Sequence, residues 1–165
     1  MPRVIPLVFV SALLAGCASD REGNPGYDPR TVYGPERQIM IAADNVQWRP
    51  GPPSLPEGAQ YAVLEGDPGE SGMFVMRLKL PDGYIIPPHT HPNVERVTVM
   101  SGVFNLGHGA RFSRERTMRM PAGSFTSMPP GMQHFAFADG ETVVQLTSIG
   151  PWEINYIDPA DDPRQ

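Results

Sequence analysis

The residues best suited to chemistry lie in one segment, residues 83–102, which reads GYIIPPHTHPNVERVTVMSG. His89 and His91 are two positions apart, and Glu95 follows four positions after the second histidine. Because side chains alternate between the two faces of a strand, both imidazoles should project to one side, with the carboxylate on the same side after a turn. Two imidazoles and a carboxylate that converge in this way are suitable ligands for a divalent metal ion.

A second turn supplies a candidate fourth ligand. Residues 129–134 read PPGMQH, and the fixed φ of Pro129 helps to set a turn that delivers His134 into a following strand. Three of the four histidines in the chain therefore fall at positions that could converge. The remaining one, His108, lies between two glycines and is expected in a loop. The alternative interpretation is that the three histidines are core or loop groups with no ion.

The spacing of these residues resembles the two sequence motifs of the cupin superfamily. The first motif is matched at every position by Gly83, His89, His91, Glu95 and Gly102. The second is resembled, up to its last position, by Gly123, Pro129, Gly131 and His134. That motif usually ends in asparagine, where this chain has Ala138. The resemblance covers residues 73–149 and implies a small single-domain (type-2) cupin, an all-β barrel of jelly-roll type whose central metal ion is held by His89, His91, Glu95 and His134.

Two segments, residues 91–102 and 150–163, are also similar to the zinc-binding cupin domain of anti-sigma proteins. The helical zinc domain of those proteins does not accompany them here, so a transcriptional role does not transfer. Cupin barrels commonly pair through edge strands, and the resemblance therefore implies a homodimer.

The ligand set has consequences for the chemistry of the ion. Three neutral imidazoles and one carboxylate would leave a divalent ion with residual positive charge and, in an octahedral geometry, with open positions for water, dioxygen or a bidentate small molecule. Manganese, iron, cobalt, nickel, copper and zinc all accept such ligands, so the identity of the metal stays open. Strand parity predicts a largely apolar pocket around the ion, lined by Met76, Val97, Val99, Phe104, Met128 and Ala138.

The elements that must position these residues are strands. The 165 residues include 20 prolines and 17 glycines, which separate short strands, and no long segment has the apolar spacing of a helix. The clearest strand is residues 73–80, where apolar and charged side chains alternate. Other strands are expected at residues 38–48, 96–100, 143–149 and 152–157, with a loop at 50–58 over the barrel. We predict one cupin domain, residues 37–157, and a charged tail, residues 158–165.

The first 17 residues read MPRVIPLVFVSALLAGC. The apolar run is too short to span a membrane as a helix and is typical of a signal peptide. Leu14 to Cys17 resemble a bacterial lipoprotein signal, which implies a signal peptide at residues 1–16, lipidation of Cys17 and a flexible tether at residues 17–36. The protein would then be lipid-anchored in the cell envelope, on the outer membrane facing the periplasm in a Gram-negative cell. The alternative is a buried first strand with a stray thiol.

Charge and composition narrow the class of partner. The net charge of −5 gives no basic face for nucleic acid, and a single cysteine excludes an internal disulfide framework. The segment Arg111–Arg119 is either an anion-steering rim or a charged hairpin edge. Two functions remain open: a metal-dependent dioxygenase, isomerase or lyase for a small carbonyl compound, or a non-catalytic cupin that binds or senses a metal or small ligand. No general acid or base is identified by sequence.

Overall fold

The computed structural model describes residues 38–165. The predicted signal peptide, Cys17 and the whole of the predicted tether lie outside the described residues. Within residues 38–165, no helix has the length and apolar character needed to cross a membrane.

The described chain consists of strands and short 3-10 turns, without an α-helix. The strands are β1 (Arg49–Pro50), β2 (Gln60–Glu65), β3 (Gly72–Leu80), β4 (Ile85–Thr90), β5 (Glu95–His108), β6 (Thr117–Pro121), β7 (Phe125–Met128), β8 (His134–Gly150) and β9 (Asn155–Tyr156). The 3-10 turns are η1 (Ala43–Asn45), η2 (Arg114–Arg116) and η3 (Pro159–Asp161). The all-β prediction is confirmed.

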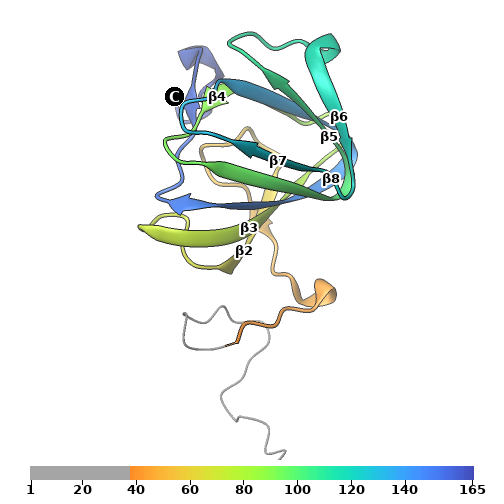
Figure 1. Ribbon diagram of the computed structural model, residues 1–165, viewed down its shortest axis with the longest axis vertical. Helices are drawn as coiled ribbons and strands as arrows, with labels where there is room; N and C mark the ends of the chain where they lie inside the picture. Colours follow the sequence, from red (N-terminus) through yellow and green to blue (C-terminus); the bar gives the residue numbers. More distant parts are fainter. Residues whose placement is uncertain (1–37) are drawn as a thin grey trace, which may run out of the picture.

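All pairing is antiparallel, and two long strands tie the barrel together. Strand β8 pairs with β3, β4 and β5, while β5 also pairs with β6 and β7. The sheet order β1-β2-β3-β8-β4-β9 places β2 and β3 on one side of the molecule and β4 on the other, next to the C-terminus (Figure 1). Because β8 begins at one of the predicted metal ligands, this central strand connects the site directly to the core.

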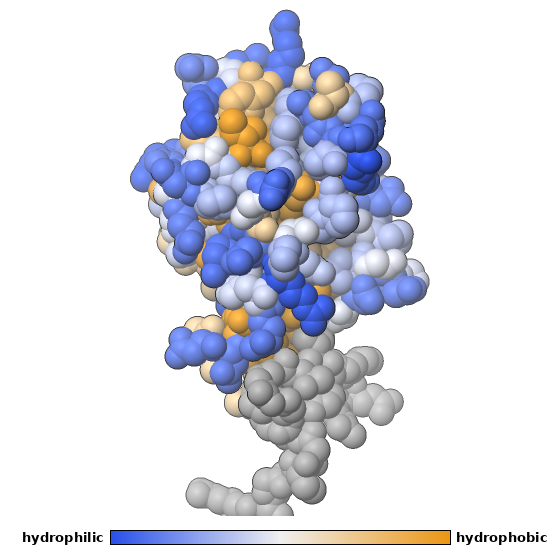
Figure 2. All heavy atoms as spheres, turned by 180° about the vertical axis from the view of Figure 1, so that it is seen from behind, coloured by the Kyte–Doolittle hydropathy of each residue, from blue (hydrophilic) through white to orange (hydrophobic). Residues whose placement is uncertain are grey.

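The barrel interior is filled by the side chains that alternate inward. In β3 the inward residues are Phe74, Met76, Leu78 and Leu80, each at most 2 % exposed, whereas Arg77 and Lys79 lie on the outer face. This is the pattern expected for a strand with one face in the core. Seen from behind, hydrophilic residues cover most of the surface, and apolar residues gather in separate patches (Figure 2).

Gly102 allows β5 to continue from one side of the barrel to the other. The β5–β8 register shifts between Val99 and Ser101 and again between Ser101 and Val103. Gly102 lies within the second shift, and its φ of 73° is in the left-handed region. A Cβ atom there would lie 2.4 Å from the Glu141 carbonyl oxygen and 2.5 Å from Thr142 Oγ1. The Thr142 hydroxyl instead donates to the Val103 carbonyl and accepts from the Val103 N–H, both at 3.1 Å. Only glycine fits this bulge.

Two of the predicted strands differ from the structure. Residues 38–48 form no strand: the segment contains η1, and pairing begins only where Arg49 lies opposite Tyr61. Residues 152–157 contribute only the two-residue strand β9. In contrast, the loop predicted at residues 50–58 is present from residue 51, after β1 ends at Pro50, and Leu55 within it is buried in the core. The predicted charged tail folds back, because Arg164 Nη2 donates to the Ile154 carbonyl at 3.0 Å.

Candidate metal centre

Three strand ends bring the predicted ligands together. His89 lies near the end of β4, Glu95 is the first residue of β5, and His134 is the first residue of β8. His89 and His134 are direct partners in the β4–β8 register, and His91 follows β4 in the turn. The Gly131 N–H donates to the His91 carbonyl at 2.9 Å, so the turn of each motif is hydrogen-bonded to the other.

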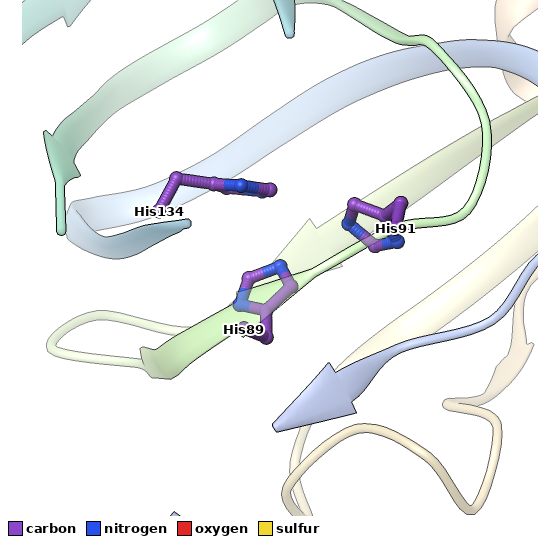
Figure 3. Close-up of side chains that lie close together, drawn as sticks. All are labelled: His89, His91 and His134. Carbon is purple, nitrogen blue, oxygen red and sulfur yellow. The ribbon is translucent and has the colours of Figure 1, made fainter. Parts of the chain in front are cut away.

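The three imidazoles point toward one another (Figure 3). One ring nitrogen of each histidine lies within 4.8 Å of the other two, and all three residues are buried. Glu95 joins them from β5: its Oε1 lies 3.3 Å from His91 Nε2, and its Oε2 lies 3.8 Å from His134 Nε2. The structure thus places all four predicted ligands in one cluster.

Backbone carbonyls determine the orientation of each imidazole. His89 Nδ1 lies 2.6 Å from the Pro87 carbonyl, and His134 Nδ1 lies 2.9 Å from the Met132 carbonyl. His91 Nδ1 lies 2.6 Å from the carbonyl of Glu153. Because a carbonyl only accepts, each Nδ1 carries the proton and donates, which leaves the Nε2 lone pair free. Metal-binding histidines are commonly held in this way by a hydrogen bond from the second ring nitrogen.

The ionisation of Glu95 is coupled to the three imidazoles around it. Burial, together with His134 and His91, lowers the pKa of His89 to about 3. Burial alone would raise the pKa of Glu95, but the neighbouring histidines, His91 above all, lower it to about 2. Burial would likewise lower the pKa of His91, but the Glu95 carboxylate raises it overall. A buried carboxylate therefore stays ionised beside the imidazoles, and its charge is balanced by a protonated His91 or by a bound cation.

The donor set fits a divalent metal ion. Three imidazole nitrogens whose tautomer is set by the backbone converge in a buried space, and a carboxylate adjoins two of them. Nitrogen donors with one carboxylate suit first-row transition ions and zinc. The three buried histidines can hold such an ion.

Trp152 is a site residue that sequence reasoning missed. Its Nε1–H donates to Glu95 Oε1 at 3.0 Å, and its ring stacks on His91 with 5.6 Å between centroids and an interplanar angle of 17°. The sequence analysis placed Trp152 in a closing strand, but it lies in the loop after β8. A large aromatic residue next to proline, inside the segment that resembles other cupins, is the sequence signal that could have identified it.

The cavity at the ligands is small and mostly apolar. Its volume is about 30 Å³, and of the six predicted pocket residues it is lined by Val97, Phe104 and Met128. Met76 lines a different, larger cavity. Val99 and Ala138 are buried in the core without lining either cavity. Strand parity therefore gave the correct face for all six, but it could not say how far along each strand the cavity extends.

The other candidates do not join the cluster. His108, expected in a loop, is the last residue of β5 and lies opposite His134 in the β5–β8 register, but it is exposed and is not among the converging histidines. In the arginine-rich segment, the Arg114 guanidinium lies over the Phe137 ring at 4.2 Å from its centroid, and Phe112 packs against Phe135 and Phe137. The hairpin is thus anchored by aromatic contacts on the outside of the barrel, and its other arginines are exposed.

Comparisons with known proteins agree with this geometry. Over 96 residues, 58 % of this chain, the sequence is 31 % identical to germin-like protein 5-1 of Oryza sativa subsp. japonica. The match covers 43 % of that relative, so the chain spans less than half of its length.

Solved structures share the fold at low sequence identity. The polyketide cyclase RemF from Streptomyces resistomycificus aligns with a TM-score of 0.60 and 16 % identity, over 78 % of this chain and 91 % of that one. An acetylacetone dioxygenase from Acinetobacter johnsonii aligns with a TM-score of 0.57 and 20 % identity, over 80 % and 85 % of the two chains. Residues 36–153, most of the chain, match the ChrR cupin-like domain family. The chain belongs to this family of cupins.

Proposed function

We propose that this protein is a metal-binding cupin of the cell envelope that holds one divalent ion with His89, His91, Glu95 and His134 and acts on a small carbonyl compound. The observation that carries the proposal is the convergence of three buried imidazoles, each with its Nδ1 donating to a backbone carbonyl and its Nε2 directed at the others. A bound cation gives a reason to bury three imidazoles whose Nε2 atoms converge beside a carboxylate, whereas an apolar core gives none.

A bound ion would supply Lewis acidity or redox chemistry for a metal-dependent dioxygenase, isomerase or lyase. The chain's own residues provide the surroundings. Trp152 donates to Glu95 and restrains the carboxylate, while Val97, Phe104 and Met128 form apolar walls that keep bulk water away from the ligands. Low polarity around the site strengthens the electrostatic interactions that these side chains make there.

A non-catalytic function in metal or small-ligand binding is the second candidate, and a specific observation favours it. Apart from the four proposed ligands, the residues that line the small cavity are apolar or, in Trp152, only a hydrogen-bond donor. No further acid or base therefore faces this cavity within residues 38–165. An enzyme that needs proton transfer would require one.

Turnover separates the two candidates. The metal-loaded protein is incubated with a panel of small diketones, 2-oxo acids and enolisable ketones, while oxygen uptake and substrate loss are recorded. The enzyme proposal predicts turnover by the wild-type protein and by His108→Ala, whose histidine is exposed outside the cluster, and none by His91→Ala. Binding without turnover across the panel would instead support the ligand-binding function.

The location in the envelope rests on the sequence alone. Leu14 to Cys17, LAGC after a short apolar run, support lipidation of Cys17 and a membrane anchor. In a native-host fractionation, the wild-type protein should partition with membranes and Cys17→Ala should be released to the soluble fraction. If Cys17→Ala remains membrane-bound, the lipid anchor is wrong while the metal site is unaffected.

A further inference from the structure

The cavity at the proposed ligands is too small for an organic molecule. Its volume of about 30 Å³ leaves room for roughly one or two water-sized groups. Binding sites for small organic molecules are usually about 300–1,000 Å³. If the proposed function is correct, the organic part of the ligand must occupy another space that communicates with the metal site.

A second cavity of suitable size adjoins the first. It has a volume of about 730 Å³ and is lined in part by Tyr61, Val63, Met76 and Trp152. Met76 and Leu78 are successive inward residues of β3, and Met76 lines the larger cavity while Leu78 lines the smaller one. The register pairs Val63 with Met76 and Tyr61 with Leu78. The two cavities therefore follow one another along the inner face of β2 and β3.

Trp152 lies between the two cavities and lines both. Its backbone is held by the Trp152 N–H, which donates to the Pro68 carbonyl at 2.7 Å. Its side chain makes one hydrogen bond, to Glu95, and stacks on His91. The indole also packs against the edge of the hydrophobic core and is only partly buried. Rotation of this side chain, with its backbone in place, would join the cavities.

The charges of the larger cavity indicate the class of ligand. Arg49 lines it, is exposed, and forms no ion pair with any residue that the structure describes. The carboxylate of Asp67, also in the lining, accepts the Gly69 N–H at 2.7 Å and is thereby partly satisfied. Val63 and Met76 offer apolar contact. A guanidinium that has no ion pair among residues 38–165 and lies beside an apolar wall suits a carboxylate that carries an apolar body.

We propose that the larger cavity is the binding site for the organic ligand of the metal centre, a small oxo-carboxylate with an apolar body whose carboxylate binds Arg49. Trp152 is the movable wall through which the carbonyl end of this ligand reaches the metal cavity. This inference rests on the proposed function, since it assigns the ligand of the same centre.

The test uses two probes that differ only at one end. 4-Oxo-4-phenylbutanoate carries an aryl ketone and a carboxylate, and butyrophenone replaces that carboxylate with a methyl group. Their dissociation constants are measured by calorimetry on the zinc-loaded full chain, with zinc content determined in the same samples. The wild-type protein should bind the carboxylate at least about tenfold more tightly, as expected for one charge-assisted contact.

Arg49→Gln should remove this preference. In this variant the carboxylate probe should bind about tenfold more weakly, and the dissociation constant of butyrophenone should stay within about twofold of the wild-type value. The control is Arg111→Gln, an exposed arginine that lines neither cavity, which should change neither dissociation constant. Equal effects of Arg49→Gln on both probes, or none on either, overturn the assignment of the carboxylate to Arg49.

The role of Trp152 is tested with cobalt in place of zinc, because the visible bands of cobalt respond when its ligands change. The carboxylate probe should perturb these bands in the wild-type protein, and the perturbation should develop several-fold faster in Trp152→Ala. A probe that binds without perturbing cobalt, or at an unchanged rate in Trp152→Ala, overturns the connection between the cavities. A chain that holds no zinc or cobalt overturns the proposed function as well, so the two failures are distinguishable.

Discussion

Replacing Trp152 with phenylalanine tests how Glu95 is held. The change removes the indole N–H that donates to Glu95 Oε1 at 3.0 Å and keeps an aromatic ring beside His91. A hydrogen bond to a charged group contributes about 1.5–3 kcal/mol, which corresponds to roughly 10- to 150-fold in an equilibrium constant.

Only part of that energy should appear in metal affinity. The same hydrogen bond exists without an ion, so its loss also affects the metal-free protein and partly cancels in the difference. The part that does not cancel is the free energy that metal binding must spend to order the Glu95 carboxylate when Trp152 no longer orients it. We therefore expect Trp152→Phe to bind zinc about tenfold more weakly, at the lower end of the usual range for residues that support metal ligands.

The assay is competition for zinc against a chromophoric chelator near pH 7.5, with thermal unfolding of the metal-free proteins recorded in parallel. The matched control is Trp48→Phe. The Trp48 ring lies 4.4 Å from Lys79 Nζ and lines neither cavity, so its replacement should leave zinc affinity unchanged. Zinc affinity in Trp152→Phe equal to that of Trp48→Phe would refute a role for the indole in positioning Glu95.

Three further predictions concern the barrel. Gly102→Ala should lower the free energy of unfolding by about 2–5 kcal/mol, and Gly140→Ala by only about 1–2 kcal/mol. Both glycines have a φ of 73°, but an added Cβ atom would meet neighbouring atoms only at Gly102. Urea titration measures both free energies. Burial raises the pKa of Tyr84 and raises that of Tyr156 to about 12. Their contribution to stability is therefore complete below pH 10 and falls as the pH rises toward 12. The double variant Tyr84→Phe and Tyr156→Phe should flatten this decline, measured as denaturation midpoints across the pH range. Zinc at about 100 times its dissociation constant should stabilise the fold by about 2.7 kcal/mol, which calorimetric melting with and without chelator detects.

Local spacing made the ligands predictable. Side-chain alternation places His89 and His91 on one side, and motif spacing adds Glu95 and His134, so four residues of the cluster follow from the sequence. The structure contributes what spacing cannot express: the Gly131 N–H joins the two turns, and three backbone carbonyls orient the rings.

Long-range and positional features were not accessible from the sequence. Trp152 reaches Glu95 across 57 residues through a loop, where strand parity gives no direction. Parity placed Met76 on the inner face correctly, but it could not reveal that Trp152 lines two separate cavities. The expected strand at residues 38–48 failed because Ala43–Asn45 turn in η1 and no neighbouring strand is available before Arg49. Pairing partners, which a single segment does not encode, decide whether an edge strand forms.

Metal analysis of protein isolated without nickel affinity steps tests the central claim most directly. The account predicts about one divalent ion per wild-type chain, the same content in His108→Ala, and almost none in His89→Ala or His134→Ala when all four proteins remain folded. A folded wild-type chain that stays empty after exposure to manganese, iron, cobalt, nickel, copper and zinc would contradict it, as would an ion that all three histidine variants retain.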